Sequence, residues 1–101
     1  NPRLYMDEKV QKNPVRYRKI FEKKGLRGCY CITLPVNRQN SLEIYSSRTF
    51  WFRYQRQRGM QIVGLASSYA NAVELVERIV QDVHMASGEI NAGKIHQYFE
   101  T

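Results

Sequence analysis

The chain has 101 residues and a formal net charge of +7 at pH 7, from 16 Lys and Arg against 9 Asp and Glu. Its length predicts one domain, and 43% apolar with 12% aromatic residues is enough for a modest core, which excludes extensive disorder. No segment approaches the ~18 apolar residues of a membrane span or has the layout of a signal peptide, so we expect a cytoplasmic protein without a membrane partner.

The positive charge is unevenly distributed along the chain. Residues 1–28 carry nine basic and three acidic side chains, and residues 29–58 carry five and one. Residues 59–101 carry two basic and five acidic side chains. The balance therefore runs from +6 through +4 to −3, and the first 58 residues are expected to attract polyanions.

Residues 1–12 are polar, with Tyr5, Met6 and Val10 as scattered apolar positions, and are expected to form a basic N-terminal arm. A single domain is expected over residues 13–101. Its first helix begins at Asn13-Pro14, a favoured cap and first-turn pair, and ends at Gly25. The basic residues on the outward side of this helix are candidate phosphate contacts, and otherwise an ordinary solvated face: Arg16, Arg18, Lys19 and Lys23.

Two strands are expected next, over residues 28–34 and 42–45. The second alternates apolar and polar side chains and should lie half exposed near a sheet edge. Cys29 and Cys31 share one face of the first, too poorly placed for a disulfide, and are expected to be buried free thiols. A metal site that combines them with His84 and His96 is the alternative, but the cysteine pair lacks the usual two- to four-residue spacer. We therefore predict no metal and no cofactor.

The segment from Ser46 to Arg58 has conflicting signals. Thr49 to Phe52 favours a strand, in which case residues 48–54 would pair with residues 60–66 in a hairpin. Two serines after a strand and the length of a crossover favour a helix. We predict the helix. In that helix the aromatic side chains of Phe50, Trp51 and Tyr54 either pack in the core or lie on the surface.

This segment is also the best candidate for a binding site. Trp51 and Tyr54 are candidates for stacking on bases, while the neighbouring arginines would hold phosphates. The arginines are Arg48, Arg53, Arg56 and Arg58. A helix that buries its aromatics and solvates its arginines would give the same sequence.

Residues 60–66 predict a buried strand, in which Gly64 marks a close approach of another backbone. Residues 67–85 predict an amphipathic helix, capped by Ser67 or Ser68 and ended by Gly88. The predicted apolar stripe follows helical spacing: Tyr69, Ala72, Val73, Val76, Ile79, Val80 and Val83. Ile95, Tyr98 and Phe99 predict a short terminal helix, which either folds back or offers its apolar face to a second copy.

These elements predict an α+β fold with the order helix, strand, strand, helix, strand, helix. A hairpin followed by a right-handed crossover gives a three-stranded mixed sheet in the order 2-1-3. Segments 40–44, 54–56, 62–66 and 72–76 together resemble a pattern in small uncharacterised bacterial α+β proteins, over about residues 26–86. That resemblance implies a fold and no activity.

No catalytic motif is present in the sequence: there is no Gly-x-Ser-x-Gly elbow, phosphate-binding loop or His-Glu-x-x-His. The chain is therefore expected to be no enzyme but a small basic binding module, with DNA, RNA or an acidic protein as its partner. A module for protein interaction or self-assembly, as a homodimer, is the alternative.

Overall fold

This computed structural model describes residues 4–22, 28–56 and 59–100; the side chains of Phe21, Glu22, Trp51 and Gln55 fall outside the description. The strands are β1 (Tyr5–Met6), β2 (Tyr30–Leu34), β3 (Glu43–Ser46) and β4 (Gln61–Ala66). The helices are α1 (Glu8–Lys12), α2 (Pro14–Glu22), α3 (Ser47–Arg56), α4 (Tyr69–Ser87) and α5 (Ala92–Glu100). The predicted α+β class is confirmed, and residues 47–56 form the predicted helix rather than a hairpin.

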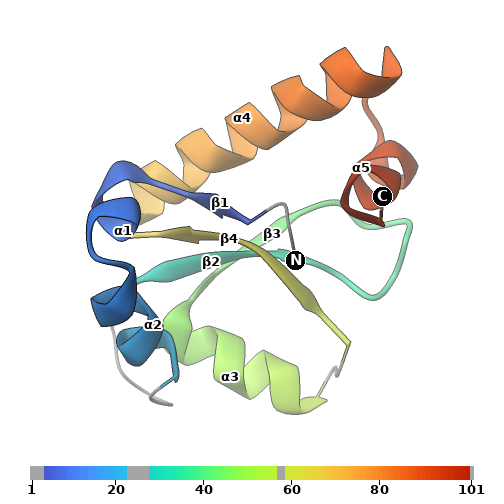
Figure 1. Ribbon diagram of the computed structural model, residues 1–101. Helices are drawn as coiled ribbons and strands as arrows, with labels where there is room; N and C mark the ends of the chain where they lie inside the picture. The colour runs from blue at the N-terminus through green and yellow to red at the C-terminus, as the bar shows by residue number, and fades with distance from the viewer. Residues whose placement is uncertain (1–3, 23–27, 57–58, 101) are drawn as a thin grey trace.

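The strands form one mixed sheet in the order β1-β4-β2-β3 (Figure 1). β2 is antiparallel to both β3 and β4, with Ile32 opposite Ile44 on one side and Gly64 on the other. The three predicted strands thus occur in the predicted order. The prediction of only three strands was wrong, because β1 pairs in parallel with β4 and is too short to show an alternating pattern.

Helices cover both faces of the sheet. Figure 1 shows α4 above the sheet with α5 beside its end, and α3 below the sheet with α2 next to it. We call these sides the α4 face and the α3 face. On the α4 face, strand residues such as Ile32 and Val63 pack against α4 and against Ile95 and Phe99 of α5. The terminal helix therefore folds back onto the core of its own chain.

The buried stripe of α4 differs in detail from the predicted one. Ala72, Leu75, Ile79 and Val83 are buried, whereas Tyr69 is 58% exposed. Apolar residues occupy more of the circumference of α4 than the sheet can cover. The way in which the helix packs on the sheet therefore decides which of these residues lie at the centre of the interface. Both predicted ends are confirmed: the Ser68 side chain accepts a hydrogen bond from the Asn71 N–H, and Gly88 has a positive φ of 78°.

The α3 face has a smaller core. Cys31, Phe50 and Met60 are buried there, and partly buried side chains, Tyr54 among them, pack around these three. Both cysteines are free and buried, as predicted. Burial, reinforced by the neighbouring Cys29, raises the pKa of the Cys31 thiol to about 12. The thiol is therefore protonated at neutral pH and packs as a small apolar group.

Gly64 lies where β4 bulges. Ile32 pairs with Gly64 and Thr33 with Ile62, which leaves Val63 as the extra residue of β4. A Cβ added to Gly64 would lie 2.9 Å from Cδ1 of Ile32. The predicted close approach exists, but the approaching group is a side chain rather than a backbone.

Residues 5–12 belong to the sheet and its helices, where the sequence predicted an arm. β1 joins the sheet edge, the Asp7 N–H donates to the Leu65 carbonyl at 3.3 Å, and Val10 of α1 is 1% exposed. The pairing of β1 is parallel and nonlocal, so no local sequence pattern announces it. Among the described helices, none is long and apolar enough to cross a membrane.

Candidate nucleic-acid interface

The α3 face carries a concentration of basic side chains. Within α2 and α3 the sequence has six basic residues and one acidic residue, a balance of +5, whereas α4 and α5 have two basic and four acidic residues, a balance of −2. The two pairs of helices lie on opposite sides of the sheet (Figure 1). The charge polarity along the chain therefore becomes a charge polarity across the molecule.

The first basic row comes from α2. This helix begins at Pro14, as predicted, with the Asn13 side chain accepting a hydrogen bond from the Arg16 N–H at 3.4 Å. Tyr17 and Ile20 are half-buried. The remaining basic side chains of the helix are exposed: Arg16, Arg18 and Lys19. Lys23, the fourth predicted contact of this row, lies outside the described residues.

The second basic row comes from α3. Arg48, Arg53 and Arg56 are exposed, while Phe50 on the opposite side of the helix is 2% exposed and fills the core of this face. The helix begins next to β3, where the Ser46 hydroxyl accepts a hydrogen bond from the Thr49 N–H at 3.1 Å. Since α3 packs beside α2, the two rows lie on neighbouring helices.

The aromatic side chains predicted for stacking are distributed differently from the arginines. Tyr54 is half-buried, and its ring stacks on Phe50 with centroids 5.5 Å apart. The side chain of Trp51, and Arg58 beyond the end of the helix, lie outside the described residues. The guanidinium of Arg53 lies 6.0 Å from the ring centroid of Tyr45 in β3, which ties this arginine to the sheet edge.

Sequence reasoning missed Phe52. Its side chain is 66% exposed and lies on the outward side of α3, among the arginines. The signal was present, because residues 48, 52 and 56 are four apart and share one side of any helix through this segment. The uncertain choice between helix and strand concealed it.

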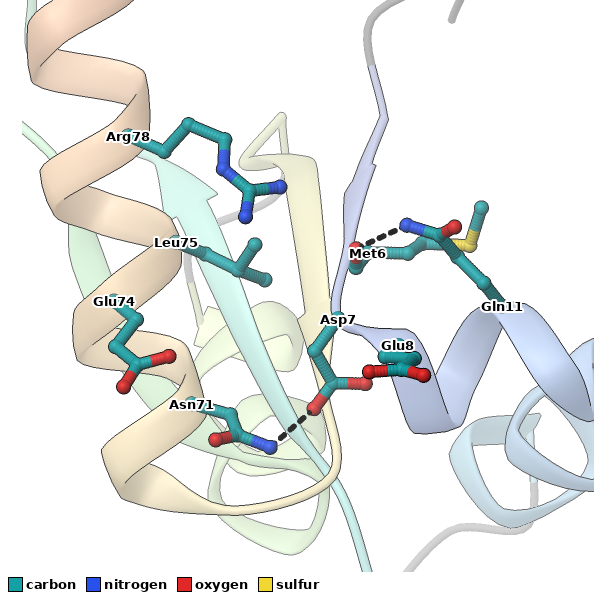
Figure 2. Close-up of a pocket in the computed structure, with 8 residues that line it drawn as sticks. All are labelled: Met6, Asp7, Glu8, Gln11, Asn71, Glu74, Leu75 and Arg78. Carbon is teal, nitrogen blue, oxygen red and sulfur yellow. Dashed lines mark hydrogen bonds between the residues drawn. The ribbon is translucent and has the colours of Figure 1, made fainter.

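A groove away from the α3 helix, beside β1, is the second candidate site (Figure 2). It has a volume of about 310 Å³ and lies between β1, α1 and the start of α4. Leu75 lines it, Glu74 and Arg78 of α4 lie along one side, and Gln11 of α1 lies on the other, where its amide donates to the Met6 carbonyl at 2.7 Å.

Asp7, at the centre of the groove, is 9% exposed and has four hydrogen-bond donors. Its Oδ1 accepts from the Val10 N–H at 2.8 Å, and its Oδ2 accepts from the Ser67 N–H and hydroxyl, both at 2.7 Å, and from the Asn71 amide at 2.8 Å. Burial by itself would raise the pKa of this carboxyl, but the hydrogen bonds from Ser67, Val10 and Asn71 outweigh it and lower the pKa. One donor lies in α1 and three lie at the start of α4, so the carboxylate joins these two segments and has a structural role.

A second polar cluster has the same character. The Tyr5 hydroxyl donates to Oδ2 of Asp82 at 2.6 Å and lies 2.8 Å from the Tyr98 hydroxyl, which links β1, α4 and α5. Burial, followed by the hydrogen bond to Asp82, raises the pKa of Tyr5. The phenol therefore keeps its proton at neutral pH and holds the N-terminal strand to the two C-terminal helices.

The histidines and cysteines do not meet. His84 is exposed, and the buried His96 places Nε2 2.9 Å from the Asn40 carbonyl oxygen. Across the described parts of the chain, no three His, Cys, Asp or Glu side chains come close enough to hold a metal ion.

Comparison of the chain with family models, with curated proteins and with solved structures finds no match. The function is therefore inferred from the geometry and charge of the molecule itself.

Proposed function

We propose that this protein is a non-catalytic module that binds nucleic acid through the exposed basic residues of α2 and α3. The observation that carries the proposal is the separation of charge by the sheet, with +5 on the helices of the α3 face and −2 on α4 and α5. A molecule charged in this way presents one side to a polyanion and turns the other away.

The exposure of the basic groups supports the same proposal. Arg16, Lys19, Arg48, Arg53 and Arg56 all reach solvent from two adjacent helices. Each phosphate that such a group neutralises releases condensed counterions, which gives sequence-independent affinity that falls with salt. The interface therefore needs no recognised reader motif to bind.

The test compares two variants that remove the same charge from opposite faces. One replaces Arg48, Arg53 and Arg56 with Gln. The control replaces Arg78 of α4, Lys94 of α5 and Arg38, which forms an ion pair with Glu100 of α5, with Gln. Binding of labelled DNA and RNA oligonucleotides is measured by fluorescence anisotropy between about 50 and 200 mM salt. We expect the α3 variant to bind weakly, with a slope of log K against log salt shallower by about 2 for a single strand. The control is expected to keep the wild-type slope.

Two results would contradict the proposal. Wild-type protein that does not bind any oligonucleotide at about 50 mM salt would remove it. Equal losses in the two charge-matched variants would also remove it, because net charge rather than the α3 face would then explain the affinity.

The cytoplasm is the proposed location. Nucleic acid is available there, and the two free cysteines suit a reducing compartment.

Self-association is the alternative function, and the position of β3 favours it. β3 is at the edge of the described sheet, and all four of its residues are half-buried. A second copy can add its own β3 to this edge. α5 is a poorer route, since Ile95 and Phe99 are already buried. Static light scattering that reports a monomer at high concentration would remove this alternative.

A further inference from the structure

The exposed side of α3 combines an aromatic ring with regularly spaced cations. Phe52 is 66% exposed, Arg48 lies one helical turn before it, and Arg56 lies one turn after it. Arg53 is adjacent and also exposed. At 1.5 Å per residue, the row from Arg48 to Arg56 spans about 12 Å, with the ring at its midpoint.

An exposed phenylalanine between arginines favours a ligand that offers both a flat apolar surface and repeated negative charge. Nucleotides have both, because each base has a π face and each phosphate accepts hydrogen bonds from a guanidinium. A polymer of acidic residues alone would pair with the arginines but would leave the ring without a partner. The sequence of α3 also contains no acidic residue that would repel a phosphate.

The position of the ring selects between single and double strands. In a duplex the faces of the bases are stacked on one another, so a side chain on a helix surface cannot reach them without unstacking a step. Unpaired bases can turn outward and stack on an exposed aromatic ring. Phe52 therefore adds affinity only where the strand is unpaired.

We infer that α3 binds single-stranded nucleic acid, with one base stacked on Phe52 and the flanking phosphates held by Arg48, Arg53 and Arg56. This inference rests on the proposed function and adds the class of nucleic acid to it. The arginines supply affinity for any strand, and the phenylalanine supplies the preference for an unpaired one.

The experiment measures wild type, Phe52→Ala and Phe52→Tyr against labelled single-stranded RNA, single-stranded DNA and the matched duplexes at low salt. We expect Phe52→Ala to weaken single-strand binding about 5- to 150-fold, the loss typical of one base–aromatic stack, and to leave duplex binding within about 2-fold of wild type. Phe52→Tyr keeps the ring and should bind like wild type. The RNA and DNA arms report which strand chemistry is preferred.

Tyr69→Ala is the matched control, because Tyr69 is an aromatic residue of similar exposure, 58%, on α4. It should leave every affinity unchanged. Far-ultraviolet circular dichroism confirms that each variant folds, which is expected for Phe52→Ala because the removed ring faces solvent. Polyglutamate is added as a competitor that has negative charge and no bases.

The outcomes separate the two proposals. If Phe52→Ala changes no affinity, or lowers single-strand and duplex affinity equally, the preference for unpaired strands is overturned, while salt-sensitive binding that depends on the α3 arginines still supports the proposed function. Competition by polyglutamate that is as strong as that of a single strand, and equally sensitive to Phe52→Ala, also overturns the inference. If wild type binds none of the oligonucleotides, the proposed function fails and this inference fails with it.

Discussion

α4 and α3 are both amphipathic helices on one sheet, but they bury different amounts of their surface. α4 has 19 residues and places Ala72, Leu75, Ile79 and Val83 in a core that also includes α5. α3 has 10 residues, and among its described side chains Phe50 and Ser47 are the buried ones. The helix that contributes most to the core therefore has a negative balance, with one basic and three acidic residues, whereas α3 has three basic residues and no acidic one.

This difference shows how a domain of 101 residues can maintain both a core and a charged surface. The α4 face accounts for most of the apolar burial, so substitutions there act on the free energy of unfolding. The α3 face carries exposed arginines and an exposed aromatic ring, so under the proposed function substitutions on its outer side are expected to act on binding and to leave stability unchanged. The following predictions test that division.

Placing a carboxylate on each face should give the largest contrast. Ile79 is 0% exposed, and Ile79→Asp would bury a charge without a partner, at a cost comparable with the whole stability of the domain, about 5 kcal/mol or more. Arg48→Asp puts the same group on the exposed side of α3, in its first turn, and should change the free energy of unfolding by less than about 0.5 kcal/mol. Urea denaturation followed by circular dichroism measures both. A folded Ile79→Asp protein would show that α4 does not hold the core.

Removing the carboxylate at the start of α1 should have the next largest effect. Asp7→Ala leaves the Val10 N–H, the Ser67 donors and the Asn71 amide without their acceptor, and we expect a loss of about 3 kcal/mol. Denaturation at pH 7 measures it. A loss below about 0.5 kcal/mol would indicate that residues 5–12 are not part of the cooperative fold.

The same carboxylate predicts a dependence on pH. Its pKa is lower in the folded chain than the ordinary value of 3.8, so its contribution is complete above that value and is lost as the pH falls through the folded pKa. The difference in stability between wild type and Asp7→Asn should therefore shrink below about pH 4. A difference that stays constant down to pH 2 would mean that the carboxylate is not stabilised in the folded state.

The smallest of these effects concerns packing between β2 and β4. Gly64→Ala places a methyl group 2.9 Å from Cδ1 of Ile32 and should cost about 2 kcal/mol. Ile32→Val removes that Cδ1 atom and by itself should cost about 1 kcal/mol. In a double-mutant cycle, the double variant is expected to lose less free energy of unfolding than the two single variants lose together. Strict additivity would show that the two side chains do not meet.

Local signals in the sequence were sufficient for much of the fold. Asn13-Pro14, Ser68 and Gly88 mark helix ends through hydrogen bonds and dihedral angles that each involve only neighbouring residues. The order of the three longer strands followed from connection lengths and handedness. β1 was missed because its two residues pair with a strand almost 60 positions away.

The candidate sites also differ in how far the sequence could predict them. The basic residues of α2 and α3 could be recognised from composition and helical spacing, and so could Phe52 once α3 is a helix. Asp7 showed only the signal of an ordinary helix cap, because three of its four donors come from Ser67 and Asn71, far along the chain.

The sequence by itself determined the class of fold, the start of α2, both ends of α4 and the unequal distribution of charge, because each depends on residue type and short-range spacing. The tertiary structure decided which side chains of α4 form the core, how Asp7 is satisfied, and that α2 and α3 come together on one face opposite the acidic helices. These features depend on contacts between distant residues, where packing and desolvation select one arrangement among many that the local pattern allows.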